Sequence, residues 1–169
     1  IDLNAAQWTI PADRMKAGKQ HVVPLSKQAV KLLRGLQKQA KGEYVFPGQR
    51  AATLSDMSIA KVIKSLHKKA MDRGDEGYTD RHMDNRVATP HGFRSTFRDW
   101  AGEQSSFPRE VIEHALAHQL KDRAEAAYQR GTSIPKRIKL MQEWAGYCDH
   151  RPAKLEKIPI PILHKKVSA

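Results

Sequence analysis

Apolar and polar positions follow two different periods along this chain, and each period predicts one kind of element. Residues 7–11 and 21–25 are short, apolar and rich in β-branched side chains, which is typical of strands. The connection between them is polar and basic and contains Gly18. We therefore expect a β-hairpin with a basic tip near the start of the chain.

Further along, apolar residues recur at intervals of three and four, which predicts amphipathic helices. The first runs from Ser26, a good N-cap residue, to Gly42, and the second from about Ser55 to about Gly74. Residues 72–89 are polar with little periodicity, so we expect a surface loop there. The apolar stripes that the helices should bury are Ala29, Leu32, Leu33 and Leu36 in the first and Ile59, Val62, Ile63 and Leu66 in the second.

The second half of the chain predicts mostly helix. Thr89 and Pro90 form a cap and first-turn pair, and the helix that they open carries Phe93, Phe97 and Trp100 to face a core. These patterns predict a mainly α fold with a small β-hairpin or sheet on the N-terminal side. Helical patterns come next at residues 108–118, 122–130 and 135–147.

The charge balance is strongly basic. Thirty Lys and Arg stand against 18 Asp and Glu, and the formal charge of +12 indicates a polyanionic partner. Nucleic acid is the commonest such partner, although a soluble basic protein without one can have the same composition.

Cysteine content and hydropathy bear on the compartment. Cys148 is the single cysteine, so it has no partner for an intramolecular disulfide and no CxxC companion for zinc, which fits a reducing interior. No apolar run approaches the roughly 20 residues of a membrane span. We therefore expect a cytoplasmic protein, and the missing initiator Met leads us to expect a fragment of a longer chain.

His91 and Arg94 are the first candidates for chemistry. They stand three positions apart at a predicted helix start, so both side chains can address one anion. The partial positive charge of a helix N-terminus favours the same ligand. Such a pair also arises by chance in basic helices, so its meaning depends on the residues downstream of it.

Two further boxes stand downstream in a fixed order. His91 and Arg94 are succeeded by Leu116-Ala117-His118 and then by Tyr128. This order resembles the tyrosine recombinase family, in particular integrases of phages and genomic islands, whose pattern is His-x-x-Arg, then Leu-Gly-His, then Tyr. The resemblance implies part of the catalytic-domain fold of that family, with Ala117 in the place of the family's glycine.

The hairpin adds to the resemblance, because the family carries a catalytic lysine on a β-turn before a strand that often ends in Val-Pro-Leu. Register against Val23, Pro24 and Leu25 selects Lys16 as the match, with Lys19 as the alternative. The plainer interpretation of both lysines is a solvated hairpin tip that touches the DNA backbone.

The resemblance implies a site-specific recombinase that integrates and excises a mobile element through a 3′-phosphotyrosyl link to Tyr128. Arg94 and His118 would bind the phosphate, Lys16 would act as general acid, and His91 would assist proton movement. No metal and no cofactor are expected. The implied partners are double-stranded DNA at attachment sites and other integrase subunits in a tetrameric synapse, and the implied location is the bacterial cytoplasm at the nucleoid.

One part of the family's pattern is missing, namely a first catalytic arginine on a helix before the hairpin. Residues 1–7 contain no arginine, and Arg14 does not match that motif. We therefore expect the chain by itself to be inactive or severely impaired. A non-catalytic DNA-binding module of the same fold, a type IB topoisomerase-like strand transferase and, last, a metal-dependent nuclease stay open as alternatives.

The resemblance and the composition together predict the domain organisation. Residues 1–150 should form the catalytic domain, without its N-terminal portion. Residues 151–169 combine three prolines with apolar and basic residues, which favours an extended tail over a helix. That tail is either a disordered end or an arm that docks on a neighbouring subunit.

Overall fold

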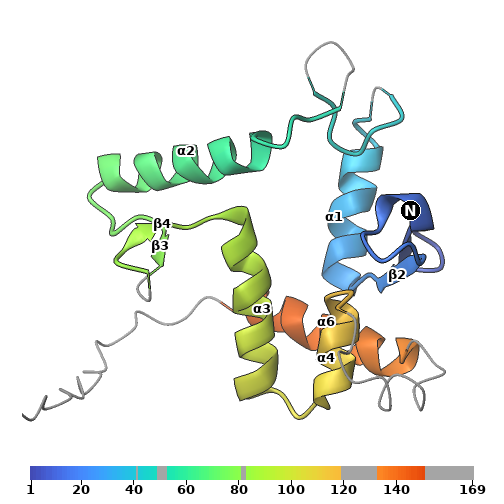
Figure 1. The fold of residues 1–169 in the computed structure, drawn as a ribbon. Helices are drawn as coiled ribbons and strands as arrows, with labels where there is room; N and C mark the ends of the chain where they lie inside the picture. The colour runs from blue at the N-terminus through green and yellow to red at the C-terminus, as the bar shows by residue number, and fades with distance from the viewer. Residues whose placement is uncertain (41, 49–52, 81–82, 119–132, 151–169) are drawn as a thin grey trace, which may run out of the picture.

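The computed structural model describes residues 1–40, 42–48, 53–80, 83–118 and 133–150. The predicted helix over 122–130, with Tyr128, and the tail at 151–169 lie outside the described residues. In Figure 1, α3 (Pro90–Gln104) runs down the middle of the view, with the hairpin on the other side of α1.

The predicted hairpin is confirmed. β1 (Gln7–Ile10) pairs antiparallel with β2 (His21–Pro24), with Gln7 opposite Pro24 and Ile10 opposite His21. A short 3-10 helix, η1 (Ala12–Arg14), begins the connection. Gly18 has a φ of +62°, a backbone conformation that favours glycine, and it turns the chain back toward β2.

Both predicted amphipathic helices form, in slightly shorter ranges. The Ser26 side chain accepts a hydrogen bond from the Ala29 amide at 3.2 Å and caps α1 (Lys27–Gln37), which ends before Gly42. α2 (Ser58–Asp72) lies close to its predicted range.

The predicted burial of the two stripes is confirmed only in part. In α1 Ala29, Leu33 and Leu36 are partly buried, and Leu32 is exposed. In α2 Ile63 is buried as predicted, but Ile59, Val62 and Leu66 are exposed. The reason is that α2 packs chiefly on the one neighbouring helix α3, which covers only a narrow strip of its apolar face, and Figure 1 shows α2 extending away from the rest of the helices.

The stretch predicted as a loop contains a small second sheet. β3 (Thr79–Asp80) pairs antiparallel with β4 (Arg86–Val87), and Asp84 and Asn85 both have positive φ values in the connection. Asn and Asp tolerate this conformation better than most residues, which lets a polar stretch without periodicity reverse direction.

The core lies where α3, α4 (Arg109–Ala115) and α6 (Ile134–Asp149) meet. Thr89 caps α3 as predicted, because its hydroxyl accepts from the Gly92 amide at 3.2 Å. Phe93, expected to face the core, is instead 61% exposed and is not among the residues that pack against the buried cluster. The buried cluster is Phe97, Trp100, Ala101, Val111, Ile112, Leu116 and Leu140.

Aromatic rings extend this core along α6. Phe97 meets Trp144 edge-on, with ring centroids 5.4 Å apart, and Tyr147 stacks on Trp144 at the same separation. Tyr147 therefore packs on the aromatic rings that extend the core. The predicted fold class, mainly α with small antiparallel β elements, is confirmed. Among the described helices, none combines the length and apolarity that crossing a bilayer would need.

Candidate functional site

The turn that ends α4 is the centre of the candidate site. The His118 amide donates to the Glu113 carbonyl at 2.9 Å, and the Ala117 amide donates to the His114 carbonyl at 3.1 Å, which together make a Schellman turn. Ala117 has a φ of +53°, in the left-handed region that glycine adopts at lower cost. The turn is therefore formed although alanine stands at the glycine position of the Leu-Gly-His pattern.

Arg94 is fastened to this turn. Its guanidinium, projecting from α3, donates to the carbonyl oxygen of Leu116, the last carbonyl before the turn. The Leu116 side chain belongs to the core, so the carbonyl that receives Arg94 is held in place by packing. Arg94, from α3, is thus held at the same turn after α4 that contains His118.

The Glu113 carboxylate contacts the His118 ring. Glu113 Oε2 lies 2.5 Å from His118 Nδ1, and Glu113 Oε1 accepts from Arg98 Nε at 3.2 Å. The Glu113 side chain is 11% exposed and that of His118 41% exposed. Burial works to raise the pKa of Glu113, but the hydrogen bonds and charges of His118 and Arg98 outweigh it, and the net pKa is lowered.

The hairpin is anchored on the same end of α4. Arg137, almost fully buried on α6, donates to the Val22 carbonyl at 2.6 Å and lies 3.3 Å from His21 Nε2. Burial first, and then the charge of Arg137, lower the pKa of His21, against a hydrogen bond with the backbone of Ala115 that raises it. The first residue of β2 therefore sits against the carbonyl end of α4.

The other predicted site residues form no hydrogen bond with the turn after α4 in the part of the chain that the structure describes. His91 is exposed in the first turn of α3, where the Gly92 amide is already taken up by Thr89. Lys16 is exposed in the turn that precedes β2 and is carried by the anchored hairpin. Tyr128 lies outside the described residues. The structure thus brings Arg94 and His118 to one turn, each through its own contact, and places the base of the lysine-bearing hairpin beside the same end of α4.

Comparison of the sequence with known proteins identifies its family. The sequence matches the model of the phage integrase family over residues 1–133. The chain belongs to the phage integrase family. Its fold is accordingly that of the tyrosine recombinase catalytic domain, as the sequence predicts.

Individual relatives agree with this assignment. Prophage integrase IntA of Escherichia coli (strain K12) is 34% identical over 146 residues, which cover 86% of this chain and 32% of that protein. The integrase of Enterobacteria phage P4 is 33% identical over 166 residues, covering 88% of this chain and 34% of that protein. The chain therefore spans about a third of the length of the curated relatives that it matches. No solved structure matches it.

Sequence reasoning about this integrase chain missed Glu113, Arg98, His21 and Arg137. Glu113 had a detectable signal, since it interrupts the apolar run of residues 111–116, where an unpaired carboxylate would be costly. The contacts of Arg98 and Arg137 join segments that are far apart in the sequence, and no local pattern reveals such pairings.

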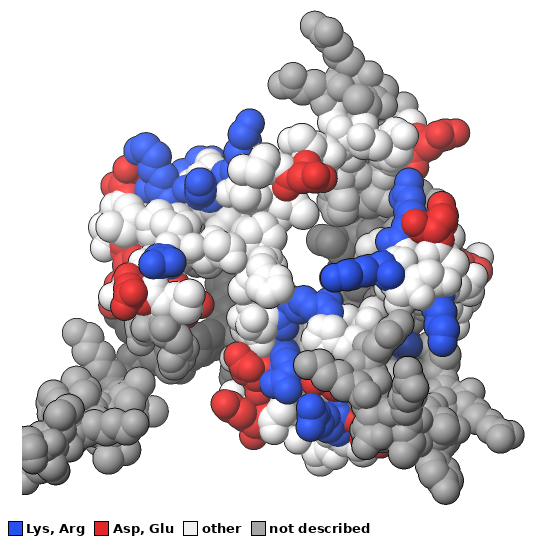
Figure 2. Space-filling model, viewed as in Figure 1, with Lys and Arg blue, Asp and Glu red and all other residues white. Residues whose placement is uncertain are grey.

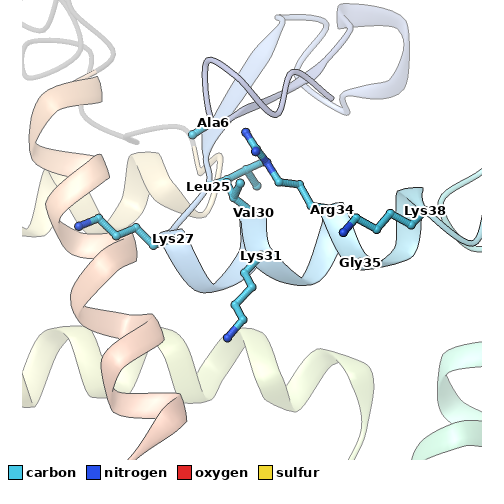
Figure 3. Close-up of a pocket in the computed structure, with 8 residues that line it drawn as sticks. All are labelled: Ala6, Leu25, Lys27, Val30, Lys31, Arg34, Gly35 and Lys38. Carbon is cyan, nitrogen blue, oxygen red and sulfur yellow. The ribbon is translucent and has the colours of Figure 1, made fainter.

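Basic side chains gather on part of the described surface. Figure 2 shows Lys and Arg side chains on the α1 side of the hollow between α1 and α3 and at its lower border, while the α3 side is mostly uncharged. A groove of about 550 Å³ along α1 is lined by Leu25 and Val30 and by four basic residues, called here the basic stripe, namely Lys27, Lys31, Arg34 and Lys38. Figure 3 shows these four side chains projecting from the helix in different directions. A cationic surface of this kind favours a polyanion.

Proposed function

We propose that this protein acts in site-specific DNA recombination, cutting and rejoining strands through a 3′-phosphotyrosyl intermediate during integration and excision of a mobile element. The observation that carries the proposal is the fastening of Arg94 and His118 to the single turn that ends α4. Consecutive Cα atoms lie about 3.8 Å apart, so an arginine held at Leu116 and a histidine two residues later can approach one phosphate.

The proposed roles rest on side-chain chemistry. Arg94 offers a planar fork for two non-bridging oxygens, and His118 offers Nε2 to the same phosphate. Both would stabilise the charge that develops when a fifth oxygen joins phosphorus.

Bond making and breaking would involve three further residues. The Tyr128 oxygen attacks phosphorus, its proton passes toward His91, and the bond from phosphorus to the 5′ oxygen breaks. Lys16 supplies the proton that the departing 5′ hydroxyl needs. The phosphotyrosyl link keeps the bond energy, so a second 5′ hydroxyl can displace Tyr128 and rejoin the DNA without ATP.

Double-stranded DNA is the proposed partner, and a synapse of four integrase subunits is the proposed assembly. The basic stripe on α1 and the Lys and Arg side chains at the lower border of the hollow support DNA binding through the phosphate backbone. Backbone contacts give affinity that falls steeply with salt and carries no sequence information, so the attachment site would be read by other contacts.

The deciding experiment traps the covalent intermediate. The complete gene product is incubated with a nicked duplex that carries one end of its mobile element, so that the cleaved strand cannot be rejoined. We expect a DNA adduct that peptide mass spectrometry maps to Tyr128 and that Tyr128→Phe abolishes. Arg94→Lys should slow adduct formation by about 100-fold, as loss of one preorganised donor typically does.

The same experiment separates the alternatives. DNA binding without any adduct in the complete gene product would support a non-catalytic module of this fold. An adduct that forms on plain duplex, with relaxation of supercoiled DNA and no need for two sites, would support a topoisomerase-like strand transferase.

A further inference from the structure

We propose that Glu113 is a positioning residue that fixes the His118 ring so that its Nε2 faces the DNA phosphate. This inference rests on the function proposed above, because it assigns a supporting residue to the same site. Glu113 touches neither the phosphate nor the nucleophile in this scheme and acts through His118.

The Glu113 carboxylate occupies a costly location. Glu113 lies on α4 next to the core residues Val111 and Ile112, and it is itself buried. An unpaired carboxylate in such surroundings would be strongly destabilising, so its contacts matter to both stability and geometry. Its two oxygens are divided between two partners from different segments, Arg98 on α3 and His118 beyond α4.

His118 is held twice by this same residue. The Glu113 carbonyl receives the His118 amide at 2.9 Å, and the Glu113 carboxylate lies 2.5 Å from the ring nitrogen Nδ1. The backbone bond sets where the side chain begins, and the carboxylate sets how the ring is turned. A ring held at Nδ1 on its protein side presents Nε2 on the opposite side.

Arg98 completes the arrangement by limiting the freedom of the carboxylate. Its Nε donates to Glu113 Oε1 at 3.2 Å, while the other oxygen, Oε2, faces His118. Since Arg98 lies on α3 one helical turn beyond Arg94, one helix supports the histidine through Glu113 and supplies the phosphate-binding arginine. His118 and Arg94 are therefore kept in register by a common scaffold.

The tautomer of His118 tests the geometry without any enzymatic assay. Long-range ¹H–¹⁵N spectra of this chain should show a proton on Nδ1 of the His118 ring, shared with the Glu113 carboxylate, and in the DNA complex Nε2 should carry a second proton that it donates to the phosphate. Glu113→Met should release the ring to a mixture of tautomers, because no acceptor remains at Nδ1, while Glu113→Gln should partly restore the held ring through its amide oxygen. Glu110→Met, on the same helix, is the matched control and should leave the His118 signals unchanged.

Backbone amide spectra check that the Glu113 variants keep the fold. If Glu113→Met folds and the His118 ring keeps the wild-type tautomer, the proposal is overturned. If Glu113→Met does not fold, Glu113→Gln and Arg98→Gln carry the test, since both should broaden or shift the His118 ring signals. Unchanged signals in both of these variants would overturn the proposal equally.

Covalent trapping with the complete gene product tests the functional part. Glu113→Met should slow adduct formation by about 10- to 100-fold, the range typical for groups that orient a metal-bound histidine, with DNA affinity changed less than about two-fold. In a His118→Ala background the same substitution should cause no further loss, because the two changes remove one effect. Additive losses would show a role independent of His118 and overturn the proposal.

The recombinase function and the positioning role fail in distinguishable ways. If the wild-type gene product forms no adduct, the proposed recombinase function fails, while the ring spectra still decide whether Glu113 orients His118. If adduct forms at the wild-type rate in a folded Glu113→Met variant, the function stands and the positioning role is refuted.

Discussion

The two ends of α3 differ in how the neighbouring chain covers them. At the lower end in Figure 1, α3 meets α4 and α6, and the buried cluster there includes Phe97 and Trp100. At the upper end, α2 covers α3 only in part, and both Val62 and Phe93 remain more than half exposed.

This difference shows that an amphipathic pattern does not by itself decide burial. Both ends carry apolar residues at helical spacing, but burial requires a second surface of matching shape. At the packed end, the same enclosure that buries Leu116 also holds its carbonyl under the Arg94 guanidinium. Core packing therefore holds the turn after α4 in place, and Arg94 reaches this turn from the less covered end of α3.

The largest expected effect comes from truncating a leucine to alanine in the core beside one end of α3 and, for comparison, on α2 beside the other end. Leu140 is 0% exposed and Leu66 is 49% exposed. We expect Leu140→Ala to lower the free energy of unfolding by about 3 to 5 kcal/mol, since it removes buried contacts and leaves a cavity. Leu66→Ala should lower it by less than about 1 kcal/mol. Urea unfolding followed by tryptophan fluorescence measures both.

A control guards against a variant that does not fold. Leu140→Met keeps the volume of the side chain and should lower the free energy of unfolding by less than about 1.5 kcal/mol. The loss at Leu140 should still exceed the loss that Leu66→Met causes. Equal losses at positions 140 and 66 would mean that the apolar face of α2 is covered in solution, and the contrast between the two ends of α3 would be lost.

The same contrast explains how far the sequence predicts the structure. The spacing of apolar residues located the hairpin, and capping signals located the helix starts at Ser26 and Thr89. Both kinds of signal depend on neighbours within a few residues. The exposure of Leu66 and Phe93 was not predictable, since it depends on which distant elements meet. For the site, the resemblance to the family's order of motifs selected Arg94 and His118, but their supporting contacts arise only in three dimensions.

A smaller effect distinguishes the turn after α4 from an ordinary helix position. Ala117 has a positive φ, so Ala117→Gly should relieve backbone strain and raise the free energy of unfolding by about 0.5 to 1 kcal/mol. Ala60, inside α2, has no such strain, and Ala60→Gly should lower it by up to about 1 kcal/mol. Thermal and urea unfolding of the two variants give the signs directly, and destabilisation by Ala117→Gly would contradict the left-handed turn.

The smallest expected effect concerns the anchor of the hairpin on the packed end. The pKa of His21 is lowered in the folded chain, above all by burial and then by Arg137, with smaller contributions from the charges of His114 and Arg94. The unfolded chain therefore binds a proton to this ring at a higher pH than the folded chain does. Stability that is fully present above the unfolded value of about 6.5 is lost as the pH falls below it.

His21→Gln should weaken that pH dependence, because the amide keeps a polar group near Arg137 but has no proton to gain. Urea unfolding should show that the free energy of unfolding falls more between pH 7.5 and pH 5.5 in the wild type than in the variant. Since the same ring ties β2 to the end of α4, the fall would also report loosening of the hairpin that carries Lys16. Equal falls in the two proteins would place the pH sensitivity elsewhere and leave the hairpin anchored by Arg137 and the Val22 carbonyl alone.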